Sequence, residues 1–401
     1  MSFIKILINY FQQRIRTLSL CRMIILIPFI LLFLMYILYS NRTNQLCDPA
    51  KPLWWFCSWP DPQTTVCTWN NHFPTITEQI RSPESYEQLL LSLPKVQSSF
   101  QFNNLTFQQC TEQSIDLLIF VISKCSHASI RQSIRRTWAN TNLLQTYFPQ
   151  LTIKLLFLVD IDTKSREKII LESNYHNDIV QVINLPEQYE YVTKRESALY
   201  EFVLNKCKQT KFIFKTDDDI FINTFLLLSK LNSFQNLINK RKTKYLLFGY
   251  PIDYGLVVRH TNSYVGQRYI ITKDEYSCPR YPTFLSGFGY LMTREICSLF
   301  FHAYQTDAKP FPLSDVYFTG LLAEMFNIQR LTMFDNVDYL YEEKCNEKFF
   351  NSAKNPFACA ASNDHFNEKN SDGDGSLMND YNLFWTKLID EYDSLKTKNR
   401  K

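Results

Sequence analysis

Glycine is scarce in this sequence, with only 8 glycines among 401 residues, so each closely spaced glycine pair marks a possible turn or close backbone approach. The net charge of +4 is too small and too dispersed to predict nucleic-acid binding. No cysteine pair has Cys-x-x-Cys spacing, so a zinc site built from sulfur is not expected. Hydrophobic residues make up 45% of the chain and aromatic residues 15%, enough for one large domain with accessory segments.

Acidic residues are absent from residues 1–22, which carry Lys5, Arg14, Arg16 and Arg22. Residues 23–39 carry no charge and would span about 25 Å as a helix, at the short end for a membrane span. The positive-inside rule predicts a cytosolic tail over 1–22, a transmembrane signal-anchor over 23–39, and the rest across the membrane. A cleaved signal peptide is the alternative, disfavoured because no small-residue cleavage site follows.

Cysteine and proline dominate the segment after the expected anchor. Ten of the 11 cysteines follow the anchor, an even number that fits disulfides in a translocated chain, although the pairing stays open. Residues 40–112 contain seven prolines, four tryptophans and four of these cysteines, with poor periodicity. They are interpreted as a stem, either a linker or a small disulfide-tied module packed on the main domain.

Residues 113–401 form the expected luminal domain. Continuous apolar runs predict buried strands over 115–123, 152–160, 179–183 and 212–214. Helical stretches are predicted between and after them, over 128–140, 164–173 and 193–207, with another near Leu383, Phe384 and Trp385. This alternation predicts an α/β domain with a mostly parallel central sheet and helices on both faces.

Three consecutive carboxylates, Asp217, Asp218 and Asp219, interrupt an apolar run. Holding three such charges beside buried strands is costly unless a cation or hydrogen-bond donors compensate. Carboxylate oxygens suit Mg²⁺ or Mn²⁺, and ligands bind at strand ends of open α/β sheets. The stretch therefore predicts a site for a metal and a diphosphate, with a solvated acidic turn as the alternative.

A second candidate site lies on the helix predicted over 128–140. Arg131, Arg135 and Trp138 are spaced i, i+4 and i+7, which predicts that they share one face of this helix. A cationic face closed by a tryptophan can hold an anion and stack on a planar ring. The alternative is a solvated basic face with Trp138 packed into the core.

Four blocks carry a resemblance to a known family. Residues 131–138 resemble the Arg-x-x-Ile-Arg-x-Thr-Trp motif of the β-1,3-galactosyltransferase / β-1,3-N-acetylglucosaminyltransferase family, which is glycosyltransferase family 31-like. Residues 215–223 resemble its Lys-x-Asp-Asp-Asp-Val-Phe-Val-Asn signature, 281–290 its Tyr-Pro-x-Tyr-x-x-Gly-x-Gly-Tyr loop, and 314–320 its Glu-Asp-Val block. The resemblance spans roughly 115–345, and residues 189–207 resemble the intervening helix.

The resemblance implies a GT-A-type, Rossmann-like nucleotide-sugar domain and an inverting, metal-dependent reaction. Asp217 and Asp219 are the implied metal-orienting pair, with Asp219 in direct contact, and His365 is the implied third ligand. The metal would be Mn²⁺ or Mg²⁺. Asp217 is also placed at the cofactor, and Asp218 faces either the ribose or the protein.

The same family assigns the base that takes the acceptor proton to Asp315. A helix N-cap is the structural alternative for this aspartate. Gly287 and Gly289 would admit substrate where a Cβ would clash, or simply form a turn. Arg131, Arg135 and Trp138 become candidate neighbours of the donor nucleotide.

Three positions depart from the family pattern. Ser314 replaces the usual glutamate, Ala139 replaces a glycine, and Arg195 stands where lysine is usual. Arg195 keeps the positive charge expected beside the nucleotide, although arginine and lysine bind phosphate differently. These changes bear on donor preference more than on reaction class.

The predicted protein is a single-pass type II Golgi membrane enzyme. It would transfer galactose or N-acetylglucosamine from UDP-galactose or UDP-N-acetylglucosamine to an acceptor glycan, forming a β-1,3 bond. No nucleic-acid partner is expected, and a homodimer is left open. The alternative is a catalytically inactive, membrane-anchored glycan-binding or scaffolding protein of the same fold, for which Ser314 is the best support.

Overall fold

A computed structural model of the protein describes residues 98–103, 110, 114–261, 266–333, 345, 357–360 and 375–398. The predicted cytosolic tail, the anchor over 23–39, most of the stem and His365 lie outside these residues. Among the helices that are described, none combines the length and the apolar character needed to cross a membrane.

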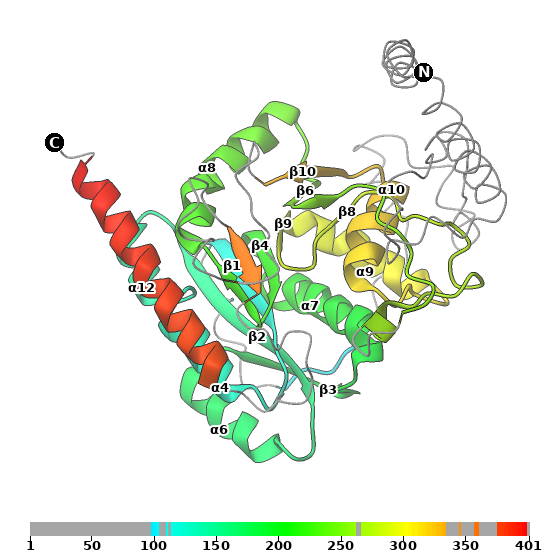
Figure 1. Cartoon of the computed structure of the whole chain (residues 1–401), viewed down its shortest axis with the longest axis horizontal. Helices are drawn as coiled ribbons and strands as arrows, with labels where there is room; N and C mark the ends of the chain where they lie inside the picture. The colour runs from blue at the N-terminus through cyan, green and yellow to red at the C-terminus, as the bar shows by residue number, and fades with distance from the viewer. Residues whose placement is uncertain are drawn as a thin grey trace, which may run out of the picture. The chain divides into compact units, whose positions relative to one another are not determined.

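A seven-stranded sheet organises the described part of the chain, in the order β10-β6-β9-β4-β1-β2-β3 (Figure 1). Its neighbouring pairs are parallel except where β9 runs antiparallel to both β4 and β6. The mostly parallel sheet predicted from the sequence is therefore confirmed, but three of its strands, β6, β9 and the edge strand β10, were not predicted, and β9 is reversed. The strands are β1 (Ile115–Ile122), β2 (Ile153–Ile161), β3 (Ile179–Pro186), β4 (Thr210–Asp217), β6 (Leu246–Gly249), β9 (Tyr290–Thr293) and β10 (Gln329–Thr332).

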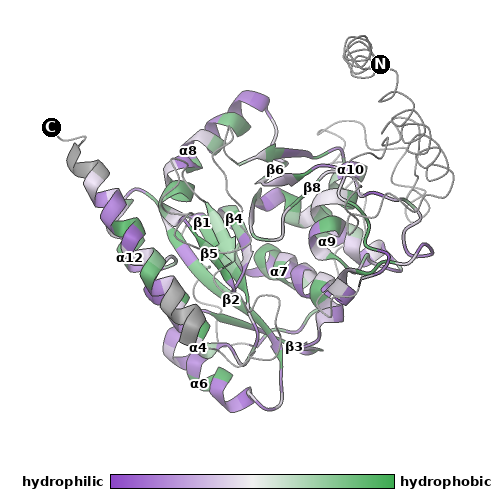
Figure 2. Ribbon diagram, viewed as in Figure 1, coloured by the Kyte–Doolittle hydropathy of each residue, from purple (hydrophilic) through white to green (hydrophobic). Residues whose placement is uncertain are grey.

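Helices cover both faces of this sheet, because its central strands are apolar on both sides (Figure 2). Alternate residues of β1 enter two different cores: Leu118 and Phe120 pack with α7 and α9, and Leu117 and Ile119 with α4, α8 and α12. The helices are α4 (Ala128–Arg136), α5 (Thr141–Tyr147), α6 (Arg166–His176), α7 (Val192–Lys206), α8 (Thr224–Arg241), α9 (Arg294–Thr306), α10 (Ala323–Met325) and α12 (Gly375–Lys398).

The helix predicted over 128–140 is two helices. The first, α4, ends at Arg136, and Asn140 then caps α5 by accepting a hydrogen bond from the Leu143 amide at 3.0 Å. Asparagine is a favoured N-cap because its side-chain oxygen satisfies an amide that has no partner in the first turn. This break matters for the site, because Trp138 lies beyond the end of the helix that carries Arg131 and Arg135.

The described part of the chain also contains two small strand pairs and three short helical turns. The two-stranded pairs are β5 (Ile220–Ile222) with β11 (Ala358–Ala360), and β7 (Pro251–Ile252) with β8 (Phe284–Leu285), both antiparallel. Two 3₁₀ turns follow, η4 (Tyr189–Tyr191) and η5 (Gly266–Tyr269), and η6 (Val316–Leu322) is a π-helix. π-Helical turns often occur at functional sites.

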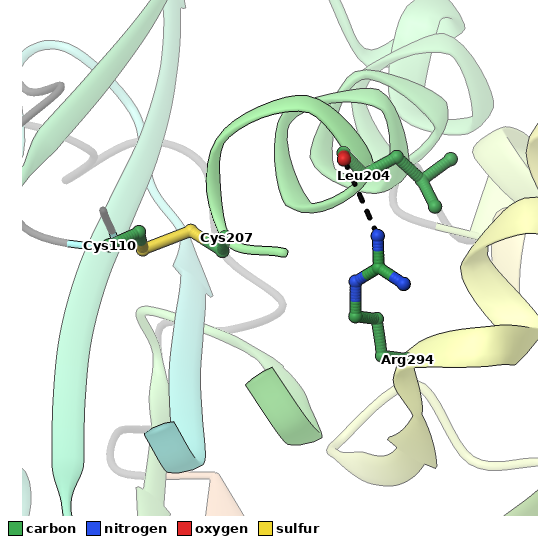
Figure 3. Close-up of a disulfide and its surroundings, with 4 residues drawn as sticks. All are labelled: Cys110, Leu204, Cys207 and Arg294. Carbon is green, nitrogen blue, oxygen red and sulfur yellow. Dashed lines mark hydrogen bonds between the residues drawn. A yellow bond between two sulfur atoms is a disulfide. The ribbon is translucent and has the colours of Figure 1, made fainter. Parts of the chain in front are cut away.

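Disulfides fix parts of this unit. Cys110 bonds Cys207 at the end of α7, close to the point where Arg294 donates to the Leu204 carbonyl at 3.4 Å (Figure 3). Cys345 bonds Cys359, whereas Cys125 and Cys297 are buried free thiols. The disulfides expected in a translocated chain are present, but pairing does not extend to every cysteine beyond the predicted anchor.

Residues 98–103, from the end of the predicted stem, pack on the sheet domain. Phe102 forms an antiparallel bridge with Val182 of β3. The amides of Ser99 and Phe100 donate to the fully buried Glu201 carboxylate at 2.9 and 3.1 Å. These last residues of the predicted stem thus contact the domain predicted over 113–401.

Candidate active site

The carboxylates lie at the carboxyl edge of the sheet, at its topological switch point. Asp217 ends β4 and pairs in register with Ile122, the last residue of β1. Strands β2 and β3 lie on one side of β1, and β4 lies on the other. Loops diverge where the strand order reverses, and this is where open α/β sheets bind ligands.

Asp218 is directed into the protein. It is 6% exposed and accepts hydrogen bonds from Ser123 Oγ at 2.6 Å and His127 Nδ1 at 2.9 Å. Burial opposes ionisation, but His127 and Ser123 outweigh it and lower the pKa of Asp218. Of the two orientations that the sequence left open, the structure shows the one that faces the protein. The Asp218 side chain bonds Ser123 and His127 and is not directed at a cofactor.

Asp217 and Asp219 are both partly open to solvent. Asp217 Oδ1 lies 3.0 Å from Lys215 Nζ, on a lysine that is only 2% exposed. Desolvation and the charge of Asp219 raise the pKa of Asp217, against the opposing effect of Lys215. A partly screened excess of negative charge remains at this edge.

Asp315 approaches the same region from another element. One of its oxygens, Oδ1, accepts a hydrogen bond from the Val316 amide at 2.8 Å and caps η6. A Cβ added at Gly287 would lie 3.2 Å from the other oxygen, Oδ2, so the glycine leaves room for this carboxylate. Both the predicted N-cap contact and a second, differently directed oxygen are therefore present.

The charge state of Asp315 reflects its neighbours. Burial is the largest cause that raises its pKa to about 6, and the charges of Glu196 and Asp217 add to it. The Val316 hydrogen bond and Lys215 act in the opposite direction. A carboxyl group with a pKa near the working pH is suited to accept a proton and release it again.

Lys215 is a buried cation that was not among the site residues expected from the sequence, although it lies within the Lys-x-Asp-Asp-Asp signature. Burial disfavours its charge, but Asp217 and the fully buried Glu196 raise its pKa above the usual value. Glu196 also accepts hydrogen bonds from the hydroxyls of Tyr200 and Tyr290. The Glu196 charge raises the pKa of Asp315 and the Lys215 charge lowers it. This buried pair therefore contributes to the charge state of Asp315.

Two tyrosines line the approach to these carboxylates. Tyr189 of η4 and Tyr269 of η5 are each 39% exposed, and their ring centroids lie 6.5 Å apart in an edge-to-face arrangement. Burial raises the pKa of Tyr269, and the charges of Asp315, Asp217 and Asp219 raise it further. The charges of all three carboxylates therefore act on the Tyr269 hydroxyl. The name carboxylate site is used below for Asp217, Asp219, Asp315 and Lys215.

Arg131 fixes the loop that follows β1. Its side chain is fully buried, and all five of its N–H donors are directed at protein oxygens of Ser123, Lys124, Cys125 and Glu172. The predicted contact with a donor nucleotide is therefore corrected, since no donor is left for an anion. Arg131 instead fixes Ser123, whose hydroxyl holds Asp218.

Arg135 and Trp138 do not belong to the carboxylate site. Arg135 is paired with Asp178 at 2.7 Å and with Glu172 at 2.8 Å. Asp178 precedes β3, so this pair lies at the amino edge of the parallel strands, opposite the carboxylates. Trp138 is 0% exposed and packs in the core shared with β1 and α8, so it cannot stack on a nucleotide. Its core packing matches the alternative stated from the sequence, but the arginines are ion-paired rather than solvated.

Arg195 lies at the carboxyl edge of the sheet, and its contact with the nucleotide stays a prediction. Its Nε donates a hydrogen bond at 2.6 Å to Asp160, a fully buried carboxylate at the second-last position of β2. Its NH2 group donates to the Gln188 carbonyl at 3.2 Å. The Asp160 contact fixes the guanidinium on the same edge as the end of β4.

Gly289 has a packing role. A Cβ there would lie 2.6 Å from the Phe214 ring, so its absence admits a core side chain of β4 rather than a ligand. This corrects the prediction for Gly289, while Gly287 remains beside Asp315.

The carboxylate site suits a hard divalent cation in part. Mg²⁺ and similar ions are commonly held by one or two carboxylates together with substrate phosphates and water. Asp217 and Asp219 supply such oxygens, and a cation would offset both the burial and the Asp219 charge that raise the pKa of Asp217. Within the described ranges, no group of three or more His, Cys, Asp or Glu side chains is arranged to hold a metal. His365 lies outside those ranges, so its predicted role stays a prediction.

Comparison with known proteins follows this geometry. The family model described as Galactosyltransferase matches residues 129–333, just over half of the chain. Mouse beta-1,3-galactosyltransferase 5 is 26% identical over 250 residues, covering 62% of this chain and 75% of the mouse protein. Human beta-1,3-galactosyltransferase 2 is 28% identical over 224 residues, covering 54% of this chain and 49% of the human protein.

Solved structures give weaker likenesses. The bifunctional glycosyltransferase WbbM has a TM-score of 0.34 at 11% identity, covering 67% of this chain and 49% of WbbM. A glycosyltransferase involved in glycosylation of the PBCV-1 major capsid has a TM-score of 0.32 at 10% identity, covering 61% and 94%. Scores this low support no further conclusion. On the family match over residues 129–333, which contain the whole carboxylate site, the chain belongs to the galactosyltransferase family.

Proposed function

We propose that this protein is an inverting, UDP-sugar-dependent β-1,3-hexosyltransferase with a GT-A-type fold. It would move galactose or N-acetylglucosamine to the 3-hydroxyl of an acceptor glycan on a glycoprotein or glycolipid. The observation that carries the proposal is the position of Asp315, whose Oδ2 lies against Gly287 and whose charge is coupled to Asp217 and Lys215. The similarity to beta-1,3-galactosyltransferases supports the linkage.

Asp315 would act as the base in this reaction. Inversion requires the acceptor hydroxyl to attack the anomeric carbon from the side opposite the nucleotide, and its proton must leave as the bond forms. The Oδ2 atom would take that proton, because Oδ1 is held by the Val316 amide. The η6 cap therefore orients the carboxylate during the transfer.

Asp217 and Asp219 would hold Mn²⁺ or Mg²⁺, with His365 as the predicted third ligand. The ion would supply positive charge beside the departing diphosphate. Lys215 is held in place by Asp217 and would keep that aspartate ionised and oriented. Arg195, fixed by Asp160, would supply a further positive charge at the same sheet edge.

Tyr189 and Tyr269 would face the acceptor. Both rings are partly exposed, and both hydroxyls are influenced by the Asp315 charge. An acceptor sugar whose hydroxyl reaches Asp315 would therefore lie beside these rings, whose apolar faces suit the C–H face of a pyranose.

The proposed location is the Golgi membrane, with residues 23–39 as a single type II anchor and the catalytic domain in the lumen. The disulfides Cys110–Cys207 and Cys345–Cys359 support an oxidising compartment.

A donor screen tests the proposal. The full-length protein is purified in detergent and incubated with Mn²⁺, a panel of UDP-sugars and short acceptor glycans, and products are detected by mass. We expect one UDP-hexose to give a product that shifts the acceptor by one sugar, with loss of the product in Asp315→Asn. Asp393→Asn, which changes an exposed carboxylate on α12, is the matched control and should retain full activity. Equal absence of turnover in wild type and Asp315→Asn would favour the glycan-binding alternative.

A further inference from the structure

Tyr381 of α12 reaches the carboxylate loop from a distant part of the chain. Its side chain is 0% exposed, and its hydroxyl donates a hydrogen bond to the backbone carbonyl of Asp218. The two residues are separated by 163 positions in the sequence. The hydroxyl therefore contacts the peptide that joins Asp218 to Asp219 rather than a neighbouring helix.

This bond completes the fixation of Asp218. The Asp218 amide donates to the Ile122 carbonyl at 3.1 Å, and its carboxylate is held by Ser123 and His127. Tyr381 binds the carbonyl. The amide, the carbonyl and the Oδ2 atom of Asp218 are thus all bonded to protein, so the residue is fixed between two partly open carboxylates.

The orientation of this peptide sets the geometry of Asp217 and Asp219. Strand β4 ends at Asp217 and β5 begins at Ile220, so residues 218 and 219 form a tight turn. Rotation of the peptide that joins them would move the Asp219 side chain relative to Asp217. A hydrogen bond to the Asp218 carbonyl opposes that rotation.

The α12 helix is held firmly enough to serve this purpose. Phe384 packs edge-to-face on Phe221 at 5.7 Å, and Trp385 stacks on Phe225 at 5.3 Å. Phe221 belongs to β5, immediately after the turn, so the same helix contacts the turn through a hydrogen bond and through ring packing. In Figure 1, α12 runs along the face of the sheet that α4 also covers.

We propose that Tyr381 is a positioning residue that fixes the Asp218 peptide and thereby the spacing of Asp217 and Asp219 for a divalent cation. The C-terminal helix would then be part of the donor site and not only a cover for the core. This inference rests on the proposed function, because it assigns the cation to those two carboxylates.

The test compares two hydroxyl deletions on the same helix interface. Tyr381→Phe removes the bond to the Asp218 carbonyl, whereas Tyr147→Phe removes a bond from α5 to Asp393 of α12 at 3.0 Å, away from the carboxylates. A third variant, Phe384→Leu, loosens the ring packing while leaving the Tyr381 hydroxyl in place. Mn²⁺ binding by the full-length protein is measured from the electron paramagnetic resonance signal of the free ion, with and without UDP, so the readout does not depend on turnover.

We expect Tyr381→Phe to weaken Mn²⁺ binding by about three- to tenfold, the range for losing one buried hydrogen bond. Tyr147→Phe should bind Mn²⁺ as the wild type does, and Phe384→Leu, which keeps the hydroxyl, should show a smaller loss than Tyr381→Phe. In activity assays the Tyr381→Phe defect should be relieved by higher Mn²⁺ concentration, with kcat recovering at saturation.

Unchanged Mn²⁺ affinity in Tyr381→Phe would overturn the inference and leave the proposed function intact. An equal loss in Phe384→Leu would also overturn it, because packing alone would then explain the effect. Absence of Mn²⁺ binding in the wild type, even with UDP, would refute both the inference and the metal-dependent part of the proposed function.

Discussion

Replacing Asp315 by asparagine should abolish activity and stabilise the fold at the same time. The side chains are nearly isosteric, and the asparagine oxygen can still accept the Val316 amide hydrogen bond that caps η6. Only the charge and the proton-accepting oxygen are lost. Opposite effects on activity and stability distinguish a residue kept for chemistry from one kept for structure.

The expected magnitude follows from the pKa of Asp315. Burial raises this pKa from 3.8 to about 6, a difference that corresponds to about 3 kcal/mol between the two protonation states. Because the carboxylate is partly open to solvent, we expect about 2 kcal/mol of added stability in Asp315→Asn above pH 6. Loss of a general base should lower kcat/KM by at least about a hundredfold.

The pH dependence has a definite sign. A raised pKa in the folded state means that stability is greatest where the group is protonated and falls as the pH rises through about 6. Below about pH 4 both folded and unfolded wild type carry the proton, so the advantage of Asp315→Asn should vanish there. The activity of the wild type should fall below about pH 6, where the base becomes protonated.

Urea unfolding at pH 7.5 and pH 4.5, without metal, measures the stability change, and the donor assay measures activity. Asp393→Asn serves as control and should change stability by less than about 0.5 kcal/mol. The reasoning fails if Asp315→Asn is less stable than wild type at pH 7.5, or if it keeps more than a tenth of wild-type turnover.

Two further changes have separable outcomes. Gly287→Ala places a Cβ 3.2 Å from Asp315 Oδ2 and should reduce kcat with little change in melting temperature, whereas Gly289→Ala meets the Phe214 ring at 2.6 Å and should destabilise the fold by about 1–3 kcal/mol. Equal thermal shifts in both alanine variants would contradict this. Arg131→Met leaves Glu172 without its bidentate partner and should cost about 3–5 kcal/mol in urea unfolding, and a cost below about 1 kcal/mol would show that Arg131 does not hold the region.

Part of the site could be predicted from the sequence because strand ends are visible in it. The apolar run of β4 ends at Asp217, and parallel strands bring their carboxyl ends to one edge, so a site at that edge followed from the pattern. The distinct environments of three adjacent aspartates could not be predicted. Asp218 is held by Ser123 and His127, which come from the loop after β1, and neither contact has a local signal.

The error at Trp138 has a specific cause. The count of i, i+4 and i+7 assumed one continuous helix, but α4 ends at Arg136 and Trp138 turns into the core. The spacing of Arg131 and Arg135 was counted within the helix, and both indeed reach Glu172. Helical spacing therefore predicted a shared face only as far as the helix extended.

The sequence by itself determined the alternation of strands and helices, the parallel sheet and the edge at which the carboxylates lie, because apolar runs and their ends are local properties of the chain. Tertiary structure decided which groups meet there. Asp315 and Tyr381 reach this region from η6 and α12, and their contacts depend on how distant elements pack. Lys215 meets Asp217 within β4, but the Glu196 charge that also acts on it comes from α7. Burial and neighbouring charges then set the protonation of each group, and both exist only in the folded protein.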